Sequence, residues 1–329
     1  MIAVIGGAGY IGSLMVKRLL AMGERVVVFD NLSRGRREAV RGAALVEGDL
    51  RRPADLDAFF GRHSIECVMH FAALASVAES VRAPELYYDN NVLGCVHLLE
   101  AMRAHGVARL IFSSTAATFG EPDVVPIPEE HPQRPTNPYG ETKRVMEQML
   151  RWHHGAHGLS SVTLRYFNAA GADPQGELGE DHEPEEHLIP NVLAAALGRR
   201  DAVQVFGTDW PTPDGTCVRD YVHVDDLCQA HYLALARLRE REGCDAFNLG
   251  NGDGCSVLEV IRAAEEVTGR AIAWRAADRR PGDPARLVAA SERARAELGW
   301  QPRFPELQAI VGHAWAWHQA HPHGYGEGE

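Results

Sequence analysis

The stretch IAVIGGAGYIG, residues 2–12, decides the fold expected for this chain. It opens with a short apolar run typical of a buried parallel strand, and a helical pattern of apolar residues follows over 10–23. Gly6, Gly9 and Gly12 lie between them with the spacing G-x-x-G-x-x-G. Such glycines allow a tight turn and bring backbone N–H groups close to a pyrophosphate at the helix N-terminus. The stretch therefore predicts a dinucleotide-binding turn.

The second expected strand, RVVVFD over 25–30, ends at Asp30. A carboxylate at this place accepts hydrogen bonds from the adenosine ribose hydroxyls and repels a 2′-phosphate, so it favours NAD over NADP. Arg34 and Arg36 follow closely and keep NADP open as the less favoured cofactor. A glycine turn that only packs the strand against the helix is the other interpretation left open.

The order of elements points to a doubly wound α/β fold. Further strands are expected over 65–73, 107–115 and 159–168, with helical patterns near 84–105 and 138–157. Strands that alternate with helices predict a Rossmann-type parallel sheet covered by helices on both faces.

After residue 168 the alternation stops. Residues 171–187 are acidic and rich in Gly and Pro, which indicates a loop, and shorter pieces of strand and helix follow it. We expect a smaller α+β lobe that binds the substrate. The predicted division gives 1–168 plus about 222–250 to the cofactor domain, and 169–221 with 251–329 to the substrate lobe.

The composition excludes several classes of protein. The 329 residues carry 33 Lys plus Arg against 45 Asp plus Glu, a net charge of −12. This charge argues against a nucleic-acid binder or an anionic membrane surface as partner. No apolar run is long enough for a membrane span, and six scattered cysteines indicate free thiols in a reducing compartment, so we expect a cytoplasmic protein. Two histidines in the tail, His321 and His323, are too few for a metal site, and none is expected.

Tyr139 and Lys143 are the strongest catalytic candidates. They stand four residues apart in the helical stretch opened by Asn137 and Pro138, so they share one face of it. Lys143 is one of only two lysines, the other being Lys17, in a chain that otherwise uses arginine. An ammonium beside a phenol favours the phenolate and makes a general base near neutral pH, a role that suits a compact charge. An exposed helical Tyr/Lys pair without function is the alternative.

A third element, IFSSTAATFG over 111–120, delivers Ser113, Ser114 and Thr115 to the carboxyl end of a strand, where α/β sheets bind ligands. One of these hydroxyls could bridge the substrate and the tyrosine. A polar turn without function is the alternative here as well.

Twelve segments in order carry a resemblance to a known family: GGAGYIGS, FDNLSRG, HFAALASVAES, YYDNNV, FSSTAATFG, PYGETK, LRYFNAAGADP, HLIP, GRRD, FGTDWPTPDGTCVRDYVHVDDL, FNLGNG and RRPGDPARLVA. Over nearly its whole length the chain resembles the UDP-glucose 4-epimerases of the extended short-chain dehydrogenase/reductase family. The resemblance implies interconversion of UDP-galactose and UDP-glucose through a transient 4-keto sugar and bound NADH, within galactose metabolism. It also implies a homodimer formed through the helices near 84–105 and 138–157.

The resemblance also assigns the site residues. Tyr139 is expected as the base, Lys143 as its activator and a ribose ligand, and Thr115 as the bridging hydroxyl. The residues expected at NAD, besides Tyr139 and Lys143, are Gly6, Gly9, Tyr10, Ile11, Gly12, Asp30, Asn31, Ser33, Asp49, Leu50, Phe71, Ala72, Ala73, Asn90, Ser113 and Phe167. Those expected at the UDP-hexose, besides Thr115 and Tyr139, are Asn168, His187, Leu188, Gln204, Phe206, Arg219, Arg280 and Asp283, with the two arginines on the diphosphate.

The chain departs from the family pattern at a few positions. Thr115 stands where many members have serine, Ala75 or Ser76 where some have lysine, and His187 where some have an asparagine facing the sugar nucleotide. In this family a residue shortly after RPGDP limits the space beside the sugar C2 substituent. Matching GDPARLVA to the family pattern gives this role to Leu287, or to Arg286 if one gap is allowed.

Rival functions share the fold. Sugar-nucleotide dehydratases usually carry an Asp-Glu pair where this chain has Ala116 and Ala117. A UDP-uronate or UDP-pentose epimerase or decarboxylase, and a non-catalytic NAD-binding regulator, are the remaining alternatives. The regulator is disfavoured because it would need only the cofactor half of these motifs.

Overall fold

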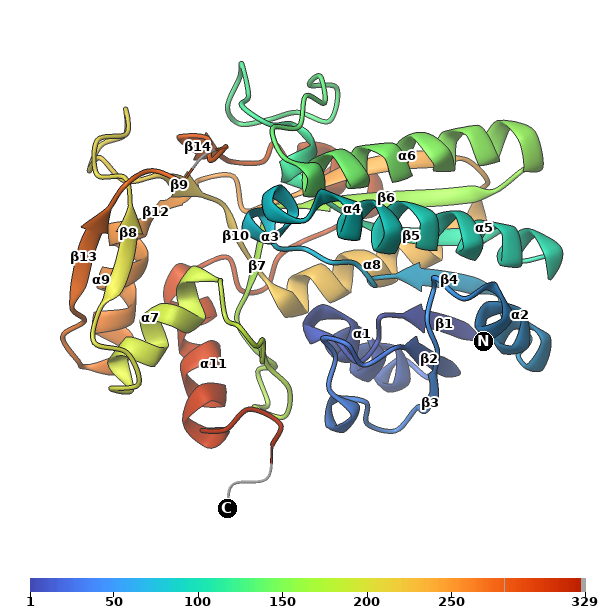
Figure 1. The fold of residues 1–329 in the computed structure, drawn as a ribbon, viewed down its shortest axis with the longest axis horizontal. Helices are drawn as coiled ribbons and strands as arrows, with labels where there is room; N and C mark the ends of the chain where they lie inside the picture. The colour runs from blue at the N-terminus through green and yellow to red at the C-terminus, as the bar shows by residue number, and fades with distance from the viewer. Residues whose placement is uncertain (281, 327–329) are drawn as a thin grey trace.

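The computed structural model describes residues 1–280 and 282–326, and a parallel seven-stranded sheet lies at its centre (Figure 1). The strand order is β11-β6-β5-β4-β1-β2-β3, so the chain starts in the middle and winds outward in both directions. This arrangement confirms the predicted doubly wound fold. The strands are β1 (Ile2–Ile5), β2 (Val26–Asp30), β3 (Ala44–Glu47), β4 (Cys67–His70), β5 (Arg109–Thr115), β6 (Ser160–Tyr166) and β11 (Cys244–Leu249).

Helices cover both faces of this sheet because successive side chains of a strand point to opposite faces. Ile2 and Val4 of β1 pack with helices α1, α8 and α10, whereas Ala3 and Ile5 pack with α2, α5 and α6. The helices of this part are α1 (Tyr10–Ala21), α2 (Pro53–Arg62), α3 (Val77–Arg82), α4 (Pro84–Tyr87), α5 (Gly94–Ala104), α6 (Pro138–His157), α8 (Val224–Glu240) and α10 (Glu292–Leu298), with short 3₁₀ turns η1 (Arg37–Ala39) and η3 (Ala116–Thr118).

The helix predicted near 84–105 is not continuous. A π-helical turn, η2 (Tyr88–Leu93), separates α4 from α5. The side chain of Asn91 in this turn bonds the backbone of Leu74 and the hydroxyl of Thr142 at 2.9 to 3.1 Å. The turn thereby fixes the loop after β4 against α6 and places Asn90 in the lining of a large cavity.

A smaller lobe lies beyond the carboxyl ends of the strands, on the left of Figure 1. Its own core is formed by α7, α9 and α11 with β8. The elements outside the central sheet are α7 (Leu188–Ala196), α9 (Val257–Thr268), α11 (Leu307–Ala320), β7 (Asn168–Ala170) paired with β10 (Tyr221–His223), β8 (Val203–Phe206) paired with β13 (Trp274–Ala277), and β9 (Val218–Arg219) paired with β12 (Cys255–Ser256) and β14 (Arg286–Leu287). The predicted domain division stays a prediction.

Within the described residues, no helix combines the length and the apolar character that crossing a bilayer requires.

Candidate active site

The turn between β1 and α1 is shaped by its glycines. Gly6 has a φ of +80°, and a Cβ there would lie 2.4 Å from the backbone nitrogen of Ala72. A Cβ on Gly12 would lie 2.2 Å from the carbonyl oxygen of Gly6, so the helix could not approach the turn this closely with any larger residue. Among the described residues no side chain caps α1 at Gly9. The backbone N–H groups of the first helical turn can therefore donate hydrogen bonds to a pyrophosphate.

Asp30 lies at the end of β2 beside this turn and lines the same cavity. Its carboxylate accepts hydrogen bonds from the N–H of Ala8 at 2.9 Å and of Leu32 at 2.8 Å. Burial nevertheless raises the pKa of Asp30. Arg34 and Arg36 pair with Glu79 and Asp181, at 3.0 and 3.1 Å. With both arginines engaged by carboxylates, the residues present fit NAD better than NADP.

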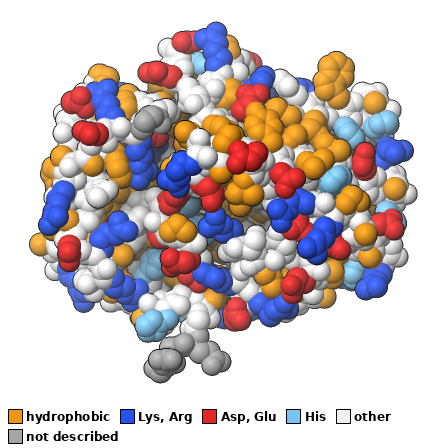
Figure 2. Space-filling model, in the orientation of Figure 1, with side chains coloured by type: hydrophobic (Ala, Val, Ile, Leu, Met, Phe, Trp, Pro, Cys, Tyr) orange, Lys and Arg blue, Asp and Glu red, His pale blue; other side chains and the backbone are white. Residues whose placement is uncertain are grey.

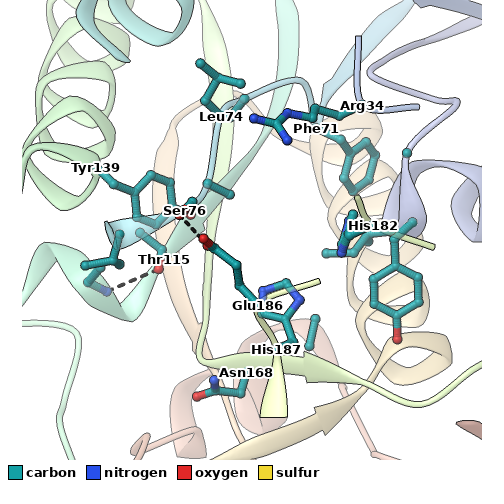
Figure 3. A pocket seen from close by; sticks show the side chains of 18 of the residues that line it. Arg34, Phe71, Leu74, Ser76, Thr115, Tyr139, Asn168, His182, Glu186 and His187 are labelled. Carbon is teal, nitrogen blue, oxygen red and sulfur yellow. Dashed lines mark hydrogen bonds between the residues drawn. The ribbon is translucent and has the colours of Figure 1, made fainter. Parts of the chain in front are cut away.

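Tyr139, Lys143 and Thr115 all line this cavity, and Figure 3 shows Tyr139 and Thr115 at its wall. Asn137 caps α6 by accepting a hydrogen bond from the N–H of Gly140 at 2.9 Å, and this places Tyr139 in the first turn. Lys143 lies one turn later on the same helix. It is 3% exposed, and its Nζ donates to the carbonyl oxygen of Ser113 at 2.8 Å.

The pKa of Tyr139 differs from the one that the sequence predicts, and the pKa of Lys143 is also shifted. Burial raises the pKa of Tyr139 to about 12, and a hydrogen bond with Thr115 opposes that rise. Burial also lowers the pKa of Lys143 to about 8. The sequence predicts a lowered pKa for the tyrosine. The chain's own groups raise it, because burial dominates and the ammonium donates to Ser113.

The other half of the cavity is built by the smaller lobe. Arg219 of β9 donates to the carbonyl of Pro284 at 2.9 Å and lies 3.7 Å from the carboxylate of Asp283. The guanidinium of Arg280 stacks 3.8 Å from the ring centroid of Phe206. Two cationic groups and an aromatic face thus lie in the same cavity, of about 840 Å³, as the glycine turn. Such a set fits a second anionic nucleotide.

Comparisons with known proteins agree with this arrangement. A family profile described as the NAD dependent epimerase/dehydratase family matches residues 2–250. The chain belongs to this family.

Similar members of this epimerase/dehydratase family include named enzymes and solved structures. The chain is 55% identical over 324 residues to a UDP-glucose 4-epimerase of Halalkalibacterium halodurans, covering 98% of this chain and 97% of that protein. It is 51% identical to the one of Lacticaseibacillus casei, with 99% of both chains covered. A Bifidobacterium longum UDP-glucose 4-epimerase in complex with NAD+ and UDP matches with a TM-score of 0.95 and 39% identity, covering 98% of this chain and 99% of that chain. The resemblance predicted from the sequence is thereby confirmed.

The cavity gathers nearly all the residues predicted for the site. One exception is Ser113, whose side chain is buried behind the wall and contacts His231. The other is Arg286, one of the two candidates for the residue beside the sugar C2 substituent. Leu287 does line the cavity. The predicted residues found there are Gly6, Gly9, Tyr10, Ile11, Gly12, Asp30, Asn31, Ser33, Asp49, Leu50, Phe71, Ala72, Ala73, Asn90, Thr115, Tyr139, Lys143, Phe167, Asn168, His187, Leu188, Gln204, Phe206, Arg219, Arg280 and Asp283.

Apart from His187, sequence reasoning missed the contribution of the acidic loop 171–187 to this epimerase-family cavity. The loop brings His182, Glu185 and Glu186 to the wall. Figure 3 shows His182 across the cavity from Tyr139. The hydroxyl of Ser76, in the loop after β4, donates to the carboxylate of Glu186. The spacing E-x-H-x-x-E-x-H over 180–187 is the signal that could have revealed this role.

Proposed function

We propose that this chain is a UDP-glucose 4-epimerase that interconverts UDP-galactose and UDP-glucose. One observation carries the proposal. Tyr139, Lys143 and Thr115 line one cavity together with the dinucleotide turn and the two arginines Arg219 and Arg280. The curated relatives at about half identity carry the same name.

In this proposal Tyr139 takes the proton from the sugar C4 hydroxyl and later returns it. Bound NAD supplies a positive ring that accepts the C4 hydride and gives it back. Thr115 holds the reacting oxygen by a hydrogen bond, and the ammonium of Lys143 stabilises the phenolate against the cost of burial. Because the hydride returns to the opposite face, the 4-keto sugar must turn over within the cavity.

The smaller lobe has the complementary task of keeping the sugar nucleotide in place while the hexose moves. We assign the diphosphate to Arg219 and Arg280, and the uracil to the region of Gln204 and Phe206. This arrangement puts the binding energy on the nucleotide, away from a hexose that has to reorient.

Elimination of water is disfavoured in the same cavity. Ala116 and Ala117, which follow Thr115, line its wall and offer neither an acid nor a base. A dehydratase would need both at this place.

The test of this proposal is Tyr139→Phe, which removes the base and keeps the ring. We expect retained NAD, an unchanged melting temperature and a loss of UDP-galactose turnover of about 100-fold or more. Turnover close to that of the wild type in a well-folded variant would remove Tyr139 from the mechanism.

We also propose a cytoplasmic homodimer. Apolar side chains gather on the face formed by α3 to α6 (Figure 2). Val81, Leu86, Tyr88 and Leu93 are 56%, 37%, 42% and 43% exposed there, and Trp152 of α6 is 78% exposed. A second copy of the chain would cover this face and pair the helices near 84–105 and 138–157.

A further inference from the structure

Four side chains of the acidic loop converge at the edge of the cavity. The carboxylate of Glu180 contacts the Nδ1 atoms of both His182 and His187, the first at 3.1 Å. The carboxylate oxygens of Glu185 lie 3.8 Å from Nδ1 of His182 and 3.6 Å from Nδ1 of His187. One ligand atom from each residue falls within 4.8 Å of all the others.

We propose that Glu180, His182, Glu185 and His187 form a binding site for a divalent transition metal of the Zn²⁺ class. Two imidazole nitrogens and two carboxylate oxygens are ligands that suit Zn²⁺, whereas Mg²⁺ prefers an all-oxygen shell. Tetrahedral Zn²⁺ with bonds of about 2.0–2.2 Å places its ligands about 3.4 Å apart. Three of the four nitrogen–oxygen distances, 3.1, 3.6 and 3.8 Å, bracket that separation, and the shorter contact between Glu180 and His187 would have to open when an ion binds.

The burial and the net charge of these four side chains also favour a divalent cation. The side chain of Glu180 is 4% exposed and forms the back of the site, whereas His187 is 53% exposed toward the cavity and leaves a way in. Two carboxylates and two neutral imidazoles together carry a charge of −2, which one divalent cation neutralises. A neutral cluster costs far less to keep partly buried than a charged one, and protons on the two imidazoles are the competing way to reach neutrality.

Contacts around the cluster hold its ligands in place before any ion binds. The N–H of His187 donates to the carboxylate of Glu185 at 2.7 Å, and the ring of His182 packs edge-on against Tyr10. The loop itself is held by Arg36, which pairs with Asp181, and by Arg34, which donates to the carbonyl of Glu183. Such outer contacts orient metal ligands and raise affinity.

A bound ion would cross-link the loop to the start of α7. Because it would bind the folded chain and not the unfolded one, it would raise the melting temperature, and the rise would grow with the logarithm of the free ion concentration above Kd. The competing account is that protons shared between the histidines and the carboxylates already satisfy the cluster, and this account predicts neither occupancy nor a thermal shift.

The test uses the full chain as purified, with its nucleotide, after a chelator has been added and removed. Equilibrium dialysis against ZnCl₂ should give one tightly held equivalent per chain, and CoCl₂ should give the visible absorption of tetrahedral Co²⁺. MgCl₂ in excess should displace neither. The melting temperature should rise on addition of Zn²⁺.

Matched variants show whether the bound Zn²⁺ is held by this cluster or by other histidines of the chain. His182→Gln/His187→Gln should lose the equivalent, the Co²⁺ absorption and the thermal shift. His153→Gln/His157→Gln, which changes a different pair of adjacent imidazole rings, on α6, should keep all three. Glu185→Gln gives a milder second variant, expected to weaken Zn²⁺ binding at least tenfold. No bound equivalent in the wild type, or equal binding in the His182/His187 or Glu185 variants, would overturn the proposal.

Discussion

Lys143 is one of two lysines among 33 basic residues, and it is almost fully buried beside Tyr139. Its Nζ donates to the carbonyl of Ser113 at 2.8 Å and lies 4.8 Å from the ring centroid of Phe112. A guanidinium is larger, planar and carries its donors in a fixed fork, so it cannot occupy this place in the same way. The other lysine, Lys17, is used differently. It pairs with Asp173 and Glu177 and ties α1 to the acidic loop.

The pKa of Lys143 leads to a prediction about pH. Burial lowers this pKa to about 8, so the ammonium is present below that pH and is lost as the pH rises through it. Since the phenolate of Tyr139 depends on this charge, we expect kcat for UDP-galactose to fall above about pH 8.

A pH–rate profile of the wild type and of Lys143→Arg checks the assignment. The arginine variant should lose most of its activity at every pH, yet its residual rate should not fall above pH 8, because the guanidinium stays charged. A wild-type rate that stays level well above pH 8 would contradict the role of Lys143.

Thr115 provides a second prediction for a single residue. The variant Thr115→Ser keeps the hydroxyl and should be nearly silent, whereas Thr115→Val should lose roughly tenfold or more in kcat, the worth of one hydrogen bond at the reacting oxygen. Both variants should melt near the wild type. If valine proved as active as serine, Thr115 would be a packing residue only.

Single elements show how far the sequence could predict this structure. The glycine turn, Asp30 and the start of α6 were predictable because each depends on local backbone geometry: a positive φ at Gly6, a strand end, and an Asn137 cap. Apart from His187, which the resemblance places at the UDP-hexose, residues 171–187 are predicted only as a loop. The spacing E-x-H-x-x-E-x-H over 180–187 is a local signal that the loop's histidines and carboxylates converge. The contacts with Arg34, Arg36 and Ser76 that hold the loop come from distant segments, and no local pattern predicts them.

Strand β14 contains the residue that we expect to determine which C2 substituent the sugar can carry. Leu287 of this strand lines the cavity, so we expect it, and not Arg286, to crowd the C2 substituent. The enzyme should prefer UDP-galactose over its N-acetyl form by about 1–3 kcal/mol, or 10–200-fold, in kcat/KM. Leu287→Ala should narrow that ratio, and Arg286→Ala is the control. An unchanged ratio in the leucine variant would show that another residue sets the limit.

At the scale of the whole molecule, the exposed apolar face of α3 to α6 predicts self-association. Leu93→Glu places a charge in this face and should shift the chain toward monomer, as measured by light scattering after size exclusion. Met22→Glu changes another exposed apolar residue, at the end of α1, and should leave the mass unchanged. A wild type that runs as a monomer would contradict the proposed dimer.

The central claim is that the molecule moves a hydride out and back within one cavity, so that NAD is kept and not consumed. The most direct measurement incubates the purified chain with UDP-galactose without added NAD, separates the sugar nucleotides, and assays the nucleotide released on denaturation. The account predicts a mixture of UDP-galactose and UDP-glucose at equilibrium, with about one NAD per chain before and after. Accumulation of NADH together with an oxidised sugar nucleotide, or no conversion by a chain that holds NAD, would contradict it.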